Sequence, residues 1–566
     1  MAKAVADTKG ENQAGFAYDT SVVTGFSHMH DSGTGGSPSM GNFPIFPHPN
    51  CPEDDINKCQ WQQDDRETAW IPKSPKARPG FFSIDLANGV HAEMTTTNRS
   101  ALYRFTFSDS DAALSPVVLV DIMDLPQLRS NGSAAVDPET GRLTGNGTFA
   151  PSFGQGTYDM HFCVDFKGAK LRDTGVWSQN RAGFEPKNVK IEPSGTISAS
   201  TNSAGSFARF HEPADGKSIM ARVGVSFIGV DQACANAERE QPNYDFEETV
   251  QTAEDAWREK LNVFSIDAEG VSKELQEVFW SGAYRTMISP QDYTGENPLW
   301  ESEEPYYDSF YWYELSPSKR INTNETSIWD SYRSIHPLLT IMDPAAQSRM
   351  VRSLVDIYRH EGFLPDCRMS LCKGYTQGGS NADVVMADAF LKKVAGVDWD
   401  TAYEAVVKDA EVEPANWDVE GRGGLRSWKK LGYIPEDNYD PDGTGTETRS
   451  ISRTVEYAYN DFCIAEMAGA MGHKEDYKKY IERSSNWKNL FKKDQTSSLN
   501  GENTGFTGFL EPRYMNGTWA YQDPIFCSPL LNFTSCYLNP DGHETYEGSS
   551  WLYSLYVTPL LPKESD

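Results

Sequence analysis

The chain has 566 residues, and its 81 acidic side chains outnumber its 51 lysines and arginines, which gives a formal net charge of −30. This excess of negative charge argues against nucleic acid and against an anionic membrane surface as partners, because both are bound through clustered positive charge. Aromatic residues make up 12% of the chain, which is typical of a folded protein, and no apolar run approaches the roughly 18 residues of a membrane span.

The N-terminal part of the chain, to about residue 245, is predicted to form an antiparallel β-sandwich. Short runs of strand-forming residues recur there between turn signals, and many short strands at roughly regular spacing are typical of a sandwich. Asn-Gly and Gly-Asn pairs at 131–132, 145–146 and 146–147 predict tight turns. The expected strands are residues 80–86, 90–97, 101–108, 115–121, 157–166, 206–210 and 221–228.

Beyond residue 245 the pattern becomes helical, with apolar residues at positions i, i+3 and i+4 and no predicted strands between the helices. The composition favours a helical toroid or bundle. We therefore expect a β-sandwich domain at residues 1–245, a helical linker at 246–265 and a helical barrel at 266–566. The expected helices are residues 246–263, 271–288, 326–342, 345–361, 383–397, 400–410, 452–471 and 475–491.

Cysteines and glycosylation sequons favour a secreted protein, although residues 1–15 show no apolar signal-peptide core. Three cysteine pairs lie close in the sequence, and an odd total of nine leaves at least one thiol unpaired. The alternative is a cytosolic protein with buried thiols. The close pairs are Cys51/Cys59, Cys367/Cys372 and Cys527/Cys536, and the six sequons begin at Asn98, Asn131, Asn146, Asn324, Asn516 and Asn532.

The first candidate site is the segment GFSHMHDSGTGG at residues 25–36. Its glycines and serines allow the backbone to approach a ligand closely. On a strand, His28 and His30 would share one face, as metal ligands do. No third ligand is suggested nearby, so a metal is not expected, and the alternative is a turn with a hydrogen-bonded histidine.

The second candidate site joins the aromatic and acidic run at residues 300–314 to the pair Trp329 and Asp330. Aromatic rings can stack on the C–H face of a sugar, while carboxylates bind its hydroxyl groups. For most of the run, an aromatic core with solvated acids is the alternative. Trp329 and Asp330 are the exception, because they are expected at the start of a helix at one end of the toroid.

Two further candidates lie at helix starts. The loop at residues 363–383 brings Asp383 into the first turn of a helix, where a simple helix cap is the alternative. Glu456 falls within the first two turns of another helix, among aromatic residues. The helix dipole favours its charged form, whereas a general acid needs a raised pKa, so the residues alone leave its role open.

Five ordered motifs resemble glycoside hydrolase family 92, the calcium-dependent exo-α-mannosidases that invert the anomeric carbon. They are GFSHMHDSGTGG, SIWDSYRSIHPLLT, GGSNADVVMADAF, SRTVEYAYNDFCIAEMAGAMG and YEGSSWLYS. The resemblance runs from about Thr8 to Tyr556 and is nearest to the secreted fungal branch. It implies an α+β multidomain fold, with an N-terminal antiparallel β-sandwich followed by an (α/α)6 helical toroid.

The resemblance assigns roles to individual residues of this chain. Glu456 matches the glutamate that the family uses as general acid, and Trp329 and Asp330 match the pair that binds the terminal mannose. Residues 509–512 fall where the family sets its linkage preference, with Glu511 as the expected contact.

Other matched residues lie further from the reacting bond. Ser32, Gly33 and Thr34 match a sandwich loop that closes over the site, and Glu547 matches an acidic residue near the sugar and the calcium. Asn381 stands where many relatives have histidine, which weakens a role for its loop.

The implied mechanism is a single displacement on a mannose-containing oligosaccharide or glycoprotein, with Ca2+ on the sugar hydroxyls. The family's general base is absent from the matching position, because the sequence departs from the family at Thr558. With Met1 matching an internal methionine of the family, we expect a chain truncated at both ends, with an incomplete toroid and no activity of its own.

Two alternative functions remain open at the level of the sequence. A catalytically inactive mannose-binding homologue is favoured by the missing base. An N-glycan amidase-like protein would need a different set of catalytic residues, and the sequence offers none.

Overall fold

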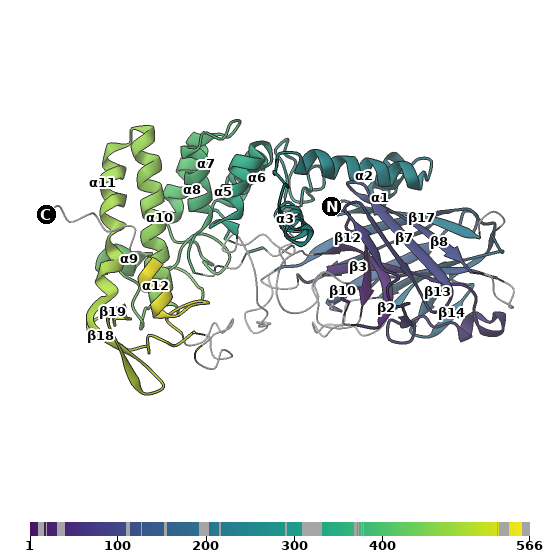
Figure 1. The fold of residues 1–566 in the computed structure, drawn as a ribbon, viewed down its shortest axis with the longest axis horizontal. Helices are drawn as coiled ribbons and strands as arrows, with labels where there is room; N and C mark the ends of the chain where they lie inside the picture. Colours follow the sequence, from purple (N-terminus) through teal and green to yellow (C-terminus); the bar gives the residue numbers. More distant parts are fainter. Residues whose placement is uncertain are drawn as a thin grey trace. The chain divides into compact units, whose positions relative to one another are not determined.

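The computed structural model forms two compact units, shown in Figure 1. The first comprises Met1–Glu301 with Tyr306–Thr323 and Met369–Cys372, and the second comprises Ser302–Pro305, Asn324–Arg368 and Lys373–Asp566. The structure describes all residues except 9–15, 19, 31–39, 109–113, 126, 152–155, 192–202, 214–216, 289–290, 308–330, 367–370, 372, 375, 377, 529, 531–542 and 557–566. Within the described ranges, no helix is both long and apolar enough to cross a bilayer.

Two antiparallel sheets build the first unit. One has the strand order β1-β2-β3-β9-β16-β13-β14, with β4 paired to β2, and the other has the order β15-β10-β11-β12-β17-β8-β7-β6-β5. The strands are β1 Val5–Thr8, β2 Val22–His30, β3 Met40–His48, β4 Thr68–Ala69, β5 Lys76–Arg78, β6 Phe81–Asp85, β7 Val90–Thr96, β8 Ser100–Phe107, β9 Val117–Asp121, β10 Arg129–Val136, β11 Leu143–Phe149, β12 Tyr158–Lys167, β13 Leu171–Ser178, β14 Arg181–Gly183, β15 Asn188–Ile191, β16 Ala204–Phe210 and β17 Ser218–Ser226.

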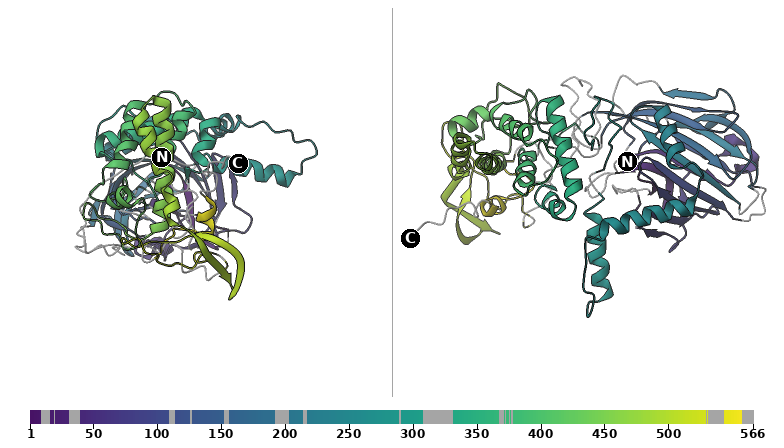
Figure 2. Two further views of the ribbon diagram at one scale, coloured as in Figure 1. Left: turned by 90° about the vertical axis from the view of Figure 1, so that its left-hand side faces the viewer. Right: turned by 90° about the horizontal axis from the view of Figure 1, so that it is seen from above.

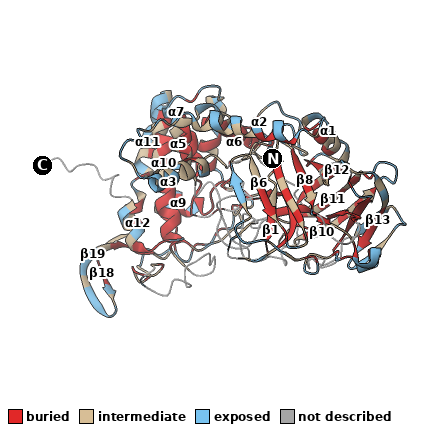
Figure 3. Ribbon diagram, turned by 45° about the vertical axis from the view of Figure 1, so that its right-hand side comes forward, coloured by how far each residue is buried: buried red, intermediate tan, exposed pale blue. Residues whose placement is uncertain are grey.

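Aromatic rings from the two sheets form the core between them. Phe26 on β2 lies 5.6 Å from Phe105 on β8, and Phe43 on β3 lies 4.6 Å from Phe162 on β12, measured between ring centroids. Central strands such as β9 are buried on both faces, whereas β11 alternates buried and half-buried residues, as expected for a strand with one face in the core. Figure 3 shows this buried layer in red.

The predicted turns at 131–132 and 145–147 are wrong, because these residues lie inside β10 and β11. The chain turns instead between Asp137 and Arg142, whose backbones are hydrogen-bonded. Glycine occurs within the strands because aromatic rings cover it: a Cβ on Gly147 would lie 2.6 Å from the Phe149 ring. Here tertiary packing overrides a local turn signal.

Among its described residues, the first unit also has the α-helices α1 Val230–Glu240, α2 Phe246–Leu261 and α3 Lys273–Arg285. α1 packs on β12 and β17, and α2 packs on β6, β7 and β8. Asp245 caps α2 by accepting from Glu248 N, and Ser272 caps α3 by accepting from Leu275 N. The predicted domain limits at residues 245 and 265 stay predictions.

The second unit is mainly helical, which confirms the predicted order of antiparallel sheets followed by a helical domain. Its longest described helix, α10, is buried on most of its faces and lies among the others, as Figure 2 shows from two sides. The helices are α5 Ile335–Met342, α6 Pro344–Glu361, α7 Ala382–Leu391, α8 Trp399–Glu411, α9 Leu425–Leu431, α10 Ser450–Met471, α11 Lys474–Arg483 and α12 Ser550–Tyr556.

The expectation of an unbroken helical domain is wrong at one place. The predicted helix 475–491 ends at Arg483, and a hairpin follows, formed by β18 Phe491–Leu499 and β19 Glu502–Leu510. Its outer part is exposed, and its base is held by Phe509, whose ring centroid lies 4.7 Å from that of Trp551 on α12. Contact with a helix distant in the sequence therefore stabilises the hairpin.

Disulfides form in the first unit. Cys51 and Cys59, which are close in the sequence, form one bridge, and a second bridge joins Cys163 on β12 to Cys234 on α1. In the second unit, Cys527 is disulfide-bonded and Cys463 is a buried free thiol. Cys367, Cys372 and Cys536 lie outside the described residues.

Candidate active site in the helical unit

Glu456 lies on the second turn of α10 with its side chain completely buried. Its Oε1 accepts a hydrogen bond from Arg333 Nη2 at 2.8 Å, and its Oε2 accepts from the Tyr332 hydroxyl at 3.0 Å. The Tyr556 hydroxyl, at the end of α12, lies 3.5 Å from the same Oε2. Three side chains from two other parts of the unit thus fix the orientation of this carboxyl group.

Burial raises the pKa of Glu456, and the Arg333 guanidinium and the two tyrosine hydroxyls oppose that rise. Burial is the larger influence. It raises the pKa because removal from water disfavours the charged form of the carboxyl group. Glu456 therefore retains its proton to higher pH than a surface glutamate does. This is the property that a general acid needs and that the sequence left open.

The glycine-rich loop before α7 lies directly against this glutamate. A Cβ on Gly379 would come within 2.5 Å of Glu456 Cβ, and Ser380 N donates to Asn460 Oδ1, one turn along α10, at 3.2 Å. The third and fourth candidate sites of the sequence are therefore brought together. The absence of a side chain at Gly379 is what allows this close approach.

The predicted Asp383 belongs to a separate buried network. Its Oδ2 accepts from Arg422 Nη2 at 2.7 Å, and Arg422 Nη1 donates to Asp461 Oδ1 at 2.6 Å. Asn381 is also fully buried and donates to Asp366 from both its backbone and its side chain, at 3.0 Å each. These contacts tie the loop and α7 to α10.

The N-terminus of α10 is held by residues far along the chain. Ser450 N donates to the Glu544 carboxylate at 2.9 Å, and Ile451 N and Ser452 N donate to the Glu544 carbonyl oxygen. The first N–H groups of a helix have no partner within it, so these contacts satisfy them. Glu544 in turn donates its backbone N–H to Gln522 Oε1 at 2.8 Å.

Glu511, which directly follows β19, is completely buried next to Gln522. Its Oε2 accepts from Gln522 N at 2.9 Å, while its Oε1 has no hydrogen-bond partner among the described residues. Burial raises its pKa to about 7. A buried carboxyl oxygen without a partner is costly, so a ligand that donates a hydrogen bond there would be favoured.

Glu547 is exposed and adopts a positive φ of 51°. Its negative charge contributes to the raised pKa of the buried Tyr553. The other predicted binding residues, Trp329, Asp330, Ser32, Gly33 and Thr34, lie outside the described residues.

In the first unit, His28 and His30 at the end of β2 are both buried. His28 Nε2 lies 2.9 Å from the Tyr103 hydroxyl, and His30 Nε2 lies 2.8 Å from Ser27 Oγ, which donates to Asp7 at 2.6 Å. Burial lowers the pKa of His28 to about 4 and of His30 to about 3, so both rings are neutral. Across the described part of the chain, no three His, Cys, Asp or Glu side chains form a metal-binding group.

Sequence reasoning missed the residues that hold the acid. Tyr332 and Arg333 follow the pair Trp329 and Asp330 in the same motif, and Tyr556 ends the last matched motif. Because all three residues lie within matched motifs, the sequence could have marked them as candidates. It could not show their contact with Glu456, since Tyr332 and Glu456 are 124 residues apart in the chain.

Two family models match this chain, one after the other along the sequence. Residues 1–226 match the model of the glycosyl hydrolase family 92 N-terminal domain, and residues 232–559 match that of the glycosyl hydrolase family 92 catalytic domain. The two matches cover nearly the whole chain. This protein belongs to glycosyl hydrolase family 92.

One curated relative is an uncharacterized secreted glycosidase of Arthroderma benhamiae, which is 51% identical over 565 residues that cover 98% of this chain and 67% of the relative. A solved family 92 inverting mannosidase of Bacteroides thetaiotaomicron shares the fold, with a TM-score of 0.75 and 22% identity over 97% of this chain and 66% of that one.

A family 92 α-mannosidase of the same bacterium, solved with mannoimidazole, has a TM-score of 0.73 and 22% identity, over 98% of this chain and 67% of that one. The chain spans about two thirds of the length of these relatives.

Proposed function

We propose that this protein is an exo-acting α-mannosidase that hydrolyses terminal α-linked mannose from N-glycans or mannans, with inversion at the anomeric carbon. Membership in a glycosyl hydrolase family supports the reaction, and the names of two structural relatives support the sugar. The observation that carries the proposal is the buried Glu456 carboxyl, held by Arg333 and Tyr332.

Glu456 acts as the general acid. It donates its proton to the glycosidic oxygen as the bond to the anomeric carbon breaks, and the aglycone leaves as an alcohol. Burial keeps the proton in place before the reaction, and the Arg333 guanidinium stabilises the carboxylate that remains afterwards. Inversion needs a second carboxylate, about 6.5–9.5 Å away, to activate water on the opposite face of the sugar. We assign Glu456 as the general acid and assign no residue as the general base.

Trp329 and Asp330 bind the terminal mannose, the indole against its C–H face and the carboxylate on its hydroxyl groups. They directly precede the segment that holds the acid, since Tyr332 and Arg333 follow within three residues. The resemblance of the SIWDSYR motif to the family supports this assignment.

Glu511 contacts the sugar on the leaving side of the bond, and its unpartnered Oε1 supports that role. Ser32, Gly33 and Thr34 cover the bound sugar, and Glu547 lies near its hydroxyl groups. The family resemblance supports these last assignments.

A calcium ion is expected from the family, and its chemistry would be to hold two sugar hydroxyls and favour a distorted ring. Calcium takes six to eight oxygen ligands. Glu547 is the one predicted ligand, and the described residues gather no group of three acidic or histidine side chains around it. The described residues therefore do not by themselves fit the ion, and the proposed proton transfer from Glu456 does not depend on it.

We also propose that the protein is secreted. Two bridges join cysteines in the first unit, which fits an oxidising compartment. Six sequons and the description of the Arthroderma benhamiae relative as secreted support the same location.

Incubation of the purified chain with an α-linked mannobiose tests the proposal. Proton NMR should detect β-mannose as the first product, since inversion of an α-linkage produces it. Early α-mannose would contradict inversion. No release of mannose, together with retained binding of the disaccharide, would assign the protein to mannose binding instead.

The Glu456→Gln variant tests the acid. It should lower kcat on the disaccharide by about 10²–10⁴, the usual contribution of general acid catalysis. The loss should be smaller on aryl mannosides, whose leaving groups need little protonation. An equal loss on both substrates would show that Glu456 has a structural role instead.

A further inference from the structure

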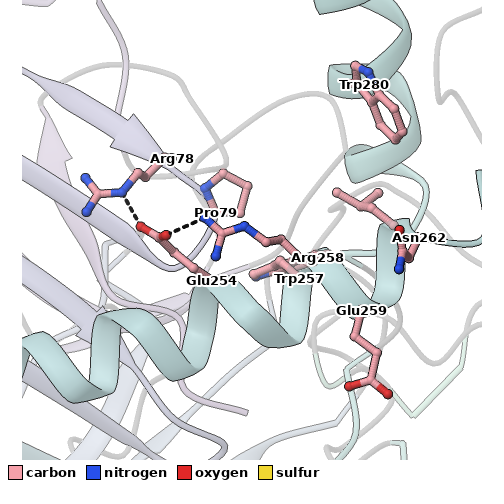
Figure 4. A pocket seen from close by; sticks show the side chains of 9 residues that line it. Arg78, Pro79, Glu254, Trp257, Arg258, Glu259, Asn262 and Trp280 are labelled. Atoms are coloured by element: carbon pink, nitrogen blue, oxygen red, sulfur yellow. Dashed lines mark hydrogen bonds and ion pairs between the residues drawn. The ribbon is translucent and has the colours of Figure 1, made fainter. Parts of the chain in front are cut away.

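A hollow of about 740 Å3 lies on the first unit, between the turn that joins β5 to β6, the end of α2 and the middle of α3 (Figure 4). Trp257 on α2 and Trp280 on α3 form its apolar surface together with Pro79 and Leu261. Its size falls within the roughly 300–1,000 Å3 that is typical of small-molecule sites. None of its lining residues takes part in the proposed hydrolysis.

Ring contacts fix both indoles in place. Trp257 packs against Tyr284 with a centroid distance of 4.5 Å, so the ring contact also joins α2 to α3. Trp280 meets Phe264 and Phe279 at nearly right angles, at 6.5 and 5.2 Å. Since both of these neighbours are perpendicular to Trp280, neither is stacked flat on its indole. Both indoles are half-buried and therefore still reach solvent.

The polar side chains around the hollow balance in charge. Glu254 forms ion pairs with Arg78 and Arg258, as Figure 4 shows, and Glu259 supplies a second carboxylate. Two arginines and two glutamates favour an uncharged ligand over an anion or a cation. Within the described residues, the exposed Glu259 carboxylate has no ion-pair partner, so it is available to accept hydrogen bonds.

We propose that this hollow is a second carbohydrate site, which holds a mannose-containing polysaccharide through sugar residues other than the one hydrolysed. An uncharged ligand with apolar C–H faces and many hydroxyl groups matches two indoles edged by Arg258, Glu259 and Asn262. Binding there would raise the local concentration of chain ends. The choice of mannan as ligand rests on the proposed function.

Affinity electrophoresis in gels that contain soluble yeast-type mannan tests the site, with dextran gels as the comparison. The chain carries Glu456→Gln so that the polymer is not consumed. Trp257→Ala and Trp280→Ala should each weaken mannan binding by about tenfold or more, because each removes a stacking surface. Arg258→Ala, at a side chain that is 64% exposed, should weaken mannan binding by a smaller factor.

Phe184→Ala is the matched control, since it removes an exposed aromatic ring on the same unit outside the hollow. Unchanged mannan binding in both tryptophan variants, or equal losses in the Phe184 variant, would overturn the proposal. Self-association that Trp280→Ala abolishes, without mannan binding, would assign the surface to a second copy of the chain.

The site and the proposed function fail in different ways. In the Glu456-containing chain, the tryptophan variants should release mannose from a small aryl mannoside at the parent rate. If the chain hydrolyses mannosides but binds mannan equally well without the tryptophans, the proposed function stands and the second site is refuted. If mannan binding requires the tryptophans but no mannoside is hydrolysed, the second site stands and the proposed function is refuted.

Discussion

Arg333 Nη2 lies 2.8 Å from Glu456 Oε1, with the arginine side chain 36% exposed and the glutamate side chain completely buried. The ion pair therefore has one partner in contact with water and one removed from it. Burial raises the pKa of Glu456, and this guanidinium is the largest of the influences that lower it, ahead of the hydroxyl groups of Tyr332 and Tyr556.

Replacing Arg333 by methionine should raise the pKa of Glu456 further, since the favourable charge is lost and burial remains. The acid must be protonated to work, so the alkaline limb of the profile of kcat/KM against pH should move to higher pH. Measurement of mannoside hydrolysis between pH 4 and 9 would check this. Arg352→Met, which breaks the 2.7 Å ion pair with Glu304 in the same unit, should leave the limb in place. A limb that moves to lower pH would contradict the assignment of Glu456 as the acid.

Replacing Gly379 by alanine should displace the acid. The new Cβ would lie 2.5 Å from Glu456 Cβ, which is well inside van der Waals contact, so the loop or α10 must shift. We expect kcat to fall by about 10²-fold, since a displacement of about 1 Å at a catalytic group costs that much. Gly282→Ala on α3, where nothing lies within 4 Å of the new Cβ, is the matched control and should retain full activity. Normal kcat in the Gly379 variant would show that this contact does not position Glu456.

Replacing Glu511 by glutamine should change how stability depends on pH. The folded chain holds the Glu511 proton to a pKa of about 7, against an ordinary value of 4.5, so it binds more protons than the unfolded chain within that window. Its stability therefore falls as the pH rises through the window, and the variant escapes this loss. Between pH 5 and 8 the variant should gain up to about 3 kcal/mol relative to the parent, at about 1.4 kcal/mol per tenfold change in proton affinity.

Urea unfolding of the parent and the variant at both pH values measures this gain. Glu502→Gln, at an exposed position on the same hairpin, should show no such difference. A relative loss of stability from pH 5 to 8 would mean that Glu511 is charged when the protein is folded.

Removing the Cys163–Cys234 bridge by a double alanine substitution should destabilise the first unit by about 4 kcal/mol, because the bridge closes a loop with a sequence separation of 71. The Cys51–Cys59 bridge, with a separation of 8, should contribute only about 2.5 kcal/mol. Urea unfolding followed by tryptophan fluorescence would rank the two variants. A larger loss for the shorter loop would indicate that native-state contacts, rather than chain entropy, govern both.

The sequence predicted strands well where burial alternates. Residues 90–97 and 101–108 correspond to β7 Val90–Thr96 and β8 Ser100–Phe107, whose inner faces meet the core. It failed at Asn131 to Gly147, because the aromatic rings that cover these glycines belong to the folded sheet and leave no trace in the local pattern.

The helices were predictable for a similar reason, and the hairpin was not. α6 Pro344–Glu361 carries a proline at its first position and an Asp343 cap, which are both local signals. β18 and β19 are largely exposed and lack a regular apolar alternation, so their formation depends on Trp551, which lies far along the chain.

At the candidate site, the sequence placed Glu456 on a helix, and the family resemblance suggested the general-acid role that we propose for it. The direction of its pKa shift required the fold, because burial and the contacts of Arg333 and Tyr332 set it. The role of Gly379 also required the fold, because its close approach to Glu456 joins two motifs that are separate in the sequence.

The contact between Ser450 and Glu544 has a consequence for the order in which the protein is made. The two residues are 94 positions apart, and Glu544 supplies the acceptors for the first turn of α10. During synthesis the ribosome releases α10 long before it adds Glu544, so this helix end remains bound to water in the nascent chain. The first turn of α10, and with it the turn that carries Glu456, therefore reaches its folded contacts only after residue 544 has been added.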